Sequence, residues 1–278
     1  MPASLRSSSF KSAATHTTLI IAVVVIAAPV LMALLFSTQT PAQIFSWPPK
    51  FMPGSAMAKN YLTAWHDYGL GRYMLNSFYI SIAVMAGKTV ISFTAAMALV
   101  YFRIPFKSWI FAFILLTLMM PTEIMIVALF ELVAGIGWAD SYAALVVPFL
   151  ASATGTFLFR QHFMQIPTSL LDAARIDGVG PFRFAWSILL PMSSNVIAAL
   201  AVIEWVYMWN QYLWPLIIIR ENTRQVVQVG LRMMTAGQDA TNWGIVMAGA
   251  IVTLVPALLV FMLLQEQFSR GFALSQEK

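Results

Sequence analysis

Cysteine is absent from this sequence, and charged residues are scarce. Asp, Glu, Lys and Arg make up 10% of the 278 residues, whereas they make up about 25% of a typical soluble domain. The absence of cysteine excludes disulfides, thiol chemistry and cysteine-ligated metals. The histidines, His16, His66 and His162, lie in separate segments without the spacing of metal ligands, so we expect no metal site.

Apolar residues take the place of the missing charge. They make up 60% of the chain, and the mean hydropathy is +0.78. A soluble domain of this length could not remove so much apolar surface from water, so we expect the lipid bilayer to be its solvent. The net charge of +5 is scattered, without the basic stripe of a nucleic-acid-binding protein, and we attribute it to orientation in the membrane.

Six apolar segments are long enough to cross the hydrocarbon layer, which takes about 20 helical residues. Because lipid offers no hydrogen bonds to the backbone, each segment should be a helix. We therefore predict an all-α, polytopic membrane protein with six transmembrane helices and no soluble domain. The segments are Thr17–Ser37, Tyr73–Phe102, Ser108–Phe130, Tyr142–Phe159, Val196–Ile219 and Gly244–Leu264, and Pro29, Pro121, Pro148, Pro215 and Pro256 should kink or end them.

The first apolar segment follows Arg6 and Lys11 and therefore resembles a signal peptide. It is longer than an ordinary signal-peptide core, and no clear small-residue cleavage site follows it, so we interpret it as an uncleaved first span. Residues 1–16 then form a cytoplasmic N-terminus, residues 17–264 the transmembrane domain, and residues 265–278 a cytoplasmic tail.

Lysine and arginine residues near the span ends predict the orientation. With the N-terminus inside, nine of them fall on the cytoplasmic side and six on the outer side, and both termini are cytoplasmic. Two connections are long. The outer one, residues 38–72, has prolines and aromatic residues suited to an ordered segment on the membrane surface. The inner one, residues 160–195, is longer than a connection between two spans requires.

The inner connection contains a short amphipathic helix, predicted over residues 166–178. Thr168 or Ser169 can cap its start, and Gly178 ends it. Periodicity alone allows two interpretations, a helix that rests on lipid headgroups and a helix that docks in a groove of a partner protein. Its apolar face carries Leu170, Leu171 and Ala174, and its polar face carries Asp172, Arg175 and Asp177.

In this connection Asp172-Ala173-Ala174 is followed after three residues by Gly178, after nine more by Ile188, and after one more by Leu190-Pro191. This spacing resembles the EAA loop of the permeases of binding-protein-dependent ABC importers. The match is position for position, except that Asp172 stands where the family has Glu. The resemblance implies that this loop couples the permease to a separate ATPase. The matching residues, and hence the candidate coupling residues, are Asp172, Ala173, Ala174, Gly178, Ile188, Leu190 and Pro191.

Residues 75–77, 209–216 and 270–272 resemble the carbohydrate-importer permeases related to the maltose system. Within that group, residues 87–88, 118–123 and 151–161 resemble the second permease subunit of sn-glycerol-3-phosphate importers. The resemblance implies a homologous second permease, two ATPases and an extracytoplasmic solute-binding protein as partners. This chain has no Gly-x-x-x-x-Gly-Lys-Ser/Thr motif, so we expect ATP and magnesium to be bound by the partner ATPase and no cofactor here.

Charged residues inside the spans should face protein or water, because charge is costly in hydrocarbon. Lys88 could meet an anionic solute such as a phosphate ester, form an internal ion pair with Glu123 or Glu204, or extend toward the interface. Glu204, Tyr207, Met208 and Gln211 share a helical face that could line a polyol-binding cavity or simply pack. The candidate substrate-pathway residues are Lys88, Asn76, Glu204, Tyr207, Asn210 and Gln211.

The function of such a membrane protein could belong to one of three classes: an importer permease, a secondary transporter or an enzyme. The resemblance favours one half of the pathway of an inner-membrane importer for sn-glycerol-3-phosphate or a related phosphodiester, with a neutral sugar or polyol as the alternative substrate. A secondary transporter would be expected to show inverted repeats or broken helices with ion ligands, and we find no such internal symmetry. An enzyme would need a clustered nucleophile, base or metal set, which the sequence lacks.

Overall fold

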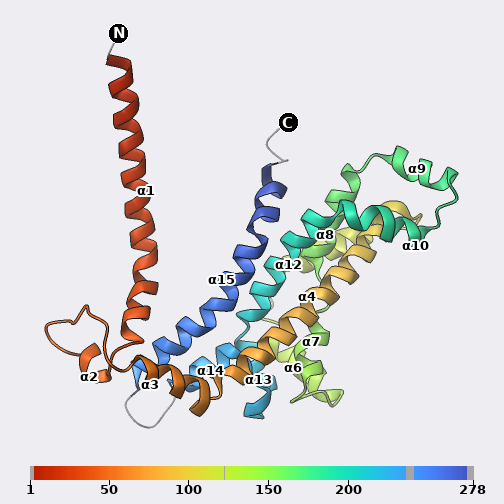
Figure 1. Cartoon of the computed structure of the whole chain (residues 1–278). Coiled ribbons are helices and arrows are strands. Elements are labelled where there is room, and N and C mark those ends of the chain that lie inside the picture. Colours follow the sequence, from red (N-terminus) through yellow and green to blue (C-terminus); the bar gives the residue numbers. More distant parts are fainter. Residues whose placement is uncertain (1–2, 122, 236–240, 274–278) are drawn as a thin grey trace. The chain divides into compact units, whose positions relative to one another are not determined.

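The computed structural model describes residues 3–121, 123–235 and 241–273 (Figure 1). All its regular elements within these ranges are helices, so the predicted all-α fold is confirmed there. The α-helices are α1 (Ala3–Phe36), α2 (Pro41–Ile44), α3 (Met57–Leu62), α4 (Leu70–Tyr101), α5 (Lys107–Leu118), α6 (Ile126–Gly135), α7 (Tyr142–Val146), α8 (Ala153–Gln165), α9 (Thr168–Ile176), α10 (Pro181–Phe184), α11 (Leu190–Met192), α12 (Ser194–Trp209), α13 (Leu213–Ile218), α14 (Val227–Met233) and α15 (Trp243–Ala273). Short 3₁₀ or π-helical turns are η1 (Thr63–Asp67), η2 (Val147–Phe149), η3 (Ala185–Leu189) and η4 (Asn222–Arg224).

Fewer membrane spans are present than the six predicted, and not all of them are continuous helices. Among the described residues, four helical segments are long and apolar enough to cross a membrane. A fifth is added if two helices bent by 75° at Ser193, Pro181–Met192 and Ser194–Trp209, count as one span. The four are Thr15–Phe36, Leu70–Tyr101, Tyr142–Gln165 and Trp243–Leu263.

The predicted third span, Ser108–Phe130, is divided into two shorter apolar helices, α5 and α6. Pro121 lies between them. A proline cannot donate a backbone hydrogen bond, and its ring clashes with the carbonyl group four residues earlier. Apolar composition therefore continues through a segment in which the helix itself stops.

Two further spans are also interrupted. The predicted fourth span is interrupted between η2 and α8. The side chain of Ser152 caps the start of α8 by accepting a hydrogen bond from the Gly155 amide at 3.0 Å. The fifth stops at the end of α12, and the amide side chain of Asn210 donates to the Val206 carbonyl at 2.8 Å. The chain resumes as α13 at Leu213.

The described residues form two compact units. One contains those up to Leu70 together with Leu231–Val255, and the other contains Gly71–Gly230 together with those from Pro256 onward. Residues 265–273 of the predicted cytoplasmic tail belong to α15, and residues 274–278 lie outside the described part. The predicted domain boundaries at residues 16 and 264 stay predictions.

In the second unit, a cluster of buried aromatic side chains joins α4 to the predicted coupling loop. The ring of Phe93 meets those of Phe159 and Phe163 edge to face, at centroid distances of 5.5 and 5.3 Å. Tyr101 packs edge to face on Phe184, and its hydroxyl donates to the Phe163 carbonyl at 3.2 Å. Because the rings interlock, α4, α8 and α10 are expected to move together at this end.

Candidate functional site

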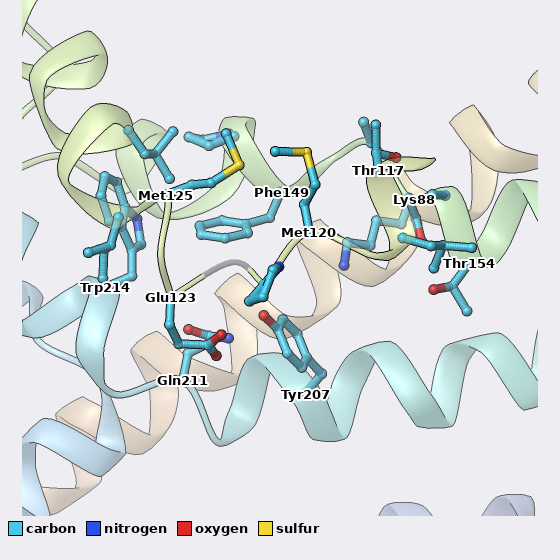
Figure 2. Close-up of a pocket in the computed structure, with 18 of the residues that line it drawn as sticks. Lys88, Thr117, Met120, Glu123, Met125, Phe149, Thr154, Tyr207, Gln211 and Trp214 are labelled. Carbon is cyan, nitrogen blue, oxygen red and sulfur yellow. The ribbon is translucent and has the colours of Figure 1, made fainter. Parts of the chain in front are cut away.

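The second unit contains a cavity of about 710 Å³, shown in Figure 2. Its wall is formed by the segment between α5 and α6, the segment between η2 and α8, and parts of α4, α6, α12 and α13. The interruptions of the third, fourth and fifth spans therefore all border the same cavity. This placement is physically reasonable, since non-helical backbone at membrane depth is tolerated where it lines a cavity.

A buried ion pair lies at the wall of this cavity. The Lys88 ammonium, on α4, donates to Oε2 of Glu204, on α12, at 2.5 Å. The two side chains are only 10% and 6% exposed. Of the alternatives predicted for Lys88, the structure thus contains the ion pair with Glu204. Both residues also line the cavity, so the pair does not hide the ammonium from a solute.

Ser152 completes this polar group, and sequence reasoning missed it as a site residue. Its hydroxyl donates to Oε1 of Glu204 at 3.1 Å while it caps α8. Each carboxylate oxygen of Glu204 thus accepts a hydrogen bond, which offsets the cost of burying the charge. The sequence offered one signal for Ser152, a serine inside an apolar segment, which is a typical cap for the start of a helix.

The rest of the cavity combines aromatic, amide and apolar surfaces (Figure 2). Tyr207 lies between the two ends, and its ring centroid is 5.3 Å from the Lys88 ammonium, within range of a cation–π interaction. Glu123 and Gln211 lie at one end, and Lys88 at the other. Phe149 and Trp214, in edge-to-face contact at 6.2 Å, belong to the apolar wall.

Two predicted pathway residues do not border the cavity. Asn76 donates to the carbonyl groups of Thr223 and Gln225 at 3.0 and 2.9 Å and accepts from the Tyr142 hydroxyl at 3.1 Å. Asn210 caps α12 and accepts from the Gln228 side chain at 3.3 Å. The structure thus brings Lys88, Glu204, Tyr207 and Gln211 together in one cavity and places Asn76 and Asn210 in loop contacts.

Asp140 organises the same group of loops. Its carboxylate Oδ1 accepts from the amides of Arg220 and Glu221 at 3.0 and 3.1 Å, and Oδ2 is 3.2 Å from the Arg224 guanidinium. The amide of Glu221, then that of Arg220, and to a smaller extent the Arg224 charge, hold the pKa of Asp140 below its ordinary value. The connection after α13 is therefore fixed to the connection before α7.

The predicted coupling helix is present as α9, and its ends differ in part from expectation. Pro167 occupies the N-cap position without a side-chain hydrogen bond, so the predicted cap by Thr168 or Ser169 was wrong. At the other end Val179 donates to Ala174 at 2.8 Å and Gly178 donates to Arg175 at 3.1 Å, the pattern of a Schellman motif. Gly178 has a φ of +70°, which explains why glycine suits this position.

The two adjacent alanines of the motif face opposite environments. Ala173 is exposed, whereas Ala174 is 5% exposed and belongs to the core cluster with Phe163 and Phe184. The family resemblance makes both alanines candidate coupling residues, whose small side chains would allow a partner to approach closely. The side chain of Ala174 is covered by the core of this chain, so of the two alanines only Ala173 presents its side chain to a partner.

The remaining motif residues divide in the same way. Ile188 and Leu190 pack against the core cluster, and Pro191 is exposed in α11. Asp172 is exposed and lies 3.4 Å from Arg175, an ion pair that contributes little because solvent screens it. Asp172, Ala173 and Pro191 are thus the motif side chains that α9 and α11 leave accessible. Among the residues that the structure describes, no group of three or more His, Cys, Asp or Glu could hold a metal ion.

Comparison with known proteins assigns this architecture to a family. Residues 88–273 match the family "Binding-protein-dependent transport system inner membrane component". Two sn-glycerol-3-phosphate transport system permease proteins UgpE are each 41% identical to this chain. The one from Brucella abortus (strain 2308) aligns over 264 residues, 92% of this chain and 94% of the relative. The one from Yersinia pestis bv. Antiqua (strain Antiqua) aligns over 269 residues, 94% and 96%.

Solved structures show the same fold. A bacterial ABC transporter that imports the acidic polysaccharide alginate has a chain with a TM-score of 0.84 at 19% identity, covering 95% of this chain and 98% of that one. The alginate transporter in complex with its pentasaccharide-bound periplasmic protein has a chain with a TM-score of 0.66 at 14% identity, covering 96% of both. On the family match and the 41% identity over most of its length, this chain belongs to the inner membrane components of binding-protein-dependent transport systems.

Proposed function

We propose that this chain forms one half of the translocation pathway of an ABC importer for sn-glycerol-3-phosphate. The observation that carries the substrate assignment is a buried ammonium, that of Lys88, at the wall of the cavity. The names of relatives at 41% identity support the same substrate. A phosphate group would approach the Lys88 end, where it would share the ammonium with Glu204.

The cavity also suits the glycerol part of such a substrate. Tyr207 and Gln211 offer a hydroxyl and an amide, groups that hydrogen-bond polyol hydroxyls. Met120, Phe149 and Trp214 supply apolar surface for carbon–hydrogen groups. Polar groups at two ends with an apolar wall between them would orient a molecule that is charged at one end only.

The helix α9 is proposed as the element that couples this cavity to ATP hydrolysis. Its exposed side, with Asp172 and Ala173, would contact the ATPase, and its buried side, with Ala174, is packed into the core shared by α4, α8 and α12. A displacement of α9 would therefore be transmitted to the helices that carry Lys88 and Glu204. ATP and magnesium would be bound by the ATPase subunits and not by this chain.

The proposed assembly contains this permease, a homologous second permease, two ATPases and an extracytoplasmic solute-binding protein, with both termini of this chain in the cytoplasm. Uptake of radiolabelled sn-glycerol-3-phosphate into proteoliposomes containing the assembled importer tests the substrate. We expect uptake and stimulated ATP hydrolysis that require the binding protein. Absence of uptake in vesicles that transport another solute would contradict the assignment.

A neutral sugar or polyol remains the second candidate, and one observation favours it. Lys88 is already neutralised by Glu204, so the pair contributes no net charge to the cavity. Competition separates the two candidates, since excess inorganic phosphate should inhibit uptake of a phosphate ester and leave uptake of a neutral polyol unchanged.

A further inference from the structure

The connection between α2 and α3 displays exposed apolar side chains. Phe45, Trp47, Phe51 and Met52 are 69%, 91%, 67% and 78% exposed, and they lie within eight consecutive residues. Large apolar side chains gathered on a surface mark a contact with protein or lipid. We call residues 45–52 the apolar tip.

The apolar tip is attached to the residues that follow α1. Gln39, which is buried, donates from Nε2 to the carbonyl groups of Lys50 and Met52, both at 2.8 Å. The Thr38 hydroxyl accepts from the Gly54 amide at 2.8 Å. These bonds hold the C-terminal end of the tip in place, so less conformational entropy would be lost when the tip makes a contact.

With α1 spanning the bilayer, its length would place the attachment points at the depth of the lipid headgroups. The apolar part of α1, Thr15–Phe36, has 22 residues, and at about 1.5 Å per residue this length matches a hydrocarbon layer about 30 Å thick. Thr38 and Gln39 follow the end of this segment within one turn. Figure 1 shows the α2–α3 connection extending from the end of α1.

The charge of this region favours phospholipid as the contact. Between Ser37 and His66 the sequence has two basic residues, Lys50 and Lys59, and no acidic residue. Aromatic side chains next to a lysine are typical of segments bound at the membrane interface, where the rings enter the headgroup layer and the ammonium meets lipid phosphates.

We propose that the apolar tip is a membrane anchor, in which Phe45, Trp47, Phe51 and Met52 enter the headgroup layer beside α1 and Lys50 binds phospholipid phosphate. The anchor would fix the depth of the end of α1 while other helices of the importer rearrange. This role is independent of the transported solute.

The absence of native cysteine allows a direct test. A Trp47→Cys variant, carrying a fluorophore sensitive to polarity, is assembled into the complete importer in vesicles of phosphatidylethanolamine and phosphatidylglycerol. The matched control is Asn222→Cys, on an exposed residue of η4. We expect shorter-wavelength emission at position 47 and several-fold stronger quenching by a nitroxide placed high on a lipid acyl chain than at position 222.

The competing contacts give different results. Equal quenching by aqueous iodide at positions 47 and 222 would show that the tip is in water and would overturn the proposal. Protection of position 47 from both quenchers would place a protein over the tip and would also overturn it. Phe51→Cys, tested in the same way, provides a second position if Trp47→Cys impairs assembly.

Discussion

The Lys88 ammonium and the Glu204 carboxylate, separated by 116 residues in sequence, meet at 2.5 Å at the wall of the cavity. A pair in this position can serve the packing of α4 against α12, the substrate, or both. Removing one partner and then both separates these roles, because an unpaired buried charge is far more costly than an apolar pair.

Lys88→Met should leave Glu204 buried without its cation and destabilise the protein by about 3–5 kcal/mol. In the double variant Lys88→Met, Glu204→Met, stability should return, since an apolar pair of similar volume replaces the ions. If Lys88 also binds the phosphate, uptake of sn-glycerol-3-phosphate should remain impaired in the double variant. Thermal unfolding and uptake kinetics measure the two effects, and normal uptake by the double variant would assign the pair to structure alone.

Gln211→Leu and Asn210→Leu form a matched test of the cavity. Gln211 borders the cavity, whereas Asn210 caps α12 and contacts Gln228. Loss of one substrate hydrogen bond of about 1 kcal/mol should raise the transport KM about fivefold for Gln211→Leu. Asn210→Leu should lower the unfolding temperature with little change in KM. A larger rise in KM for Asn210→Leu than for Gln211→Leu would instead indicate that the substrate binds at the end of α12.

The adjacent alanines of α9 should respond differently to the same enlargement. Ala174→Leu forces a larger side chain into the aromatic core and should destabilise the permease by about 1–3 kcal/mol. Ala173→Leu changes an exposed surface and should leave permease stability intact while weakening co-purification of the ATPase. Equal effects of the two variants on stability would show that α9 does not keep this orientation in the assembled importer.

Gly178 should tolerate asparagine better than valine. No atom lies near the position of an added Cβ, so the obstacle to a larger residue is the positive φ and not lack of space. A non-glycine residue in this left-handed conformation costs about 1–2 kcal/mol, and asparagine adopts it more readily than a β-branched residue. ATPase co-purification and substrate-stimulated hydrolysis should therefore fall more for Gly178→Val than for Gly178→Asn.

The loops joined by Asp140 should loosen in acid. Since the pKa of Asp140 is lowered in the folded protein, the carboxylate contributes stability above its unfolded value of about 4, and this contribution is lost as the pH falls through the folded value. Hydrogen exchange at the amides of Arg220 and Glu221 should accelerate, relative to their intrinsic rates, over that range. Asp140→Asn should remove most of this pH dependence, and an unchanged dependence in that variant would point to another group.

Hydropathy was sufficient to predict the fold class, and motif spacing was sufficient to predict the family, but neither predicted the helix interruptions. The segment from Ser108 to Phe130 stays apolar, although its helical backbone hydrogen bonds stop near Pro121. Composition alone therefore predicts a single span there. Ser152 was missed for a related reason. Its place at a helix start was a local signal for a cap, but its hydrogen bond to Glu204 of another helix is a long-range contact, which leaves no local signal in one sequence.

Helical periodicity contained more information about α9 than we used. Ala174 shares the apolar face with Leu170 and Leu171, which indicates burial, whereas Ala173 does not. We assigned the two alanines one role because the family motif places them side by side. The motif describes what the loop does as a whole, and the periodicity describes where each side chain points.

The interruptions around Pro121, Ser152 and Asn210 have a mechanical consequence. A continuous helix resists bending along its whole length, because every turn is held by backbone hydrogen bonds. Where the helix is interrupted, a change in direction requires only a few backbone dihedral angles to rotate. The cavity is thus bordered by joints between rigid rods, and its two ends can be reshaped separately while each helical segment keeps its own hydrogen bonds.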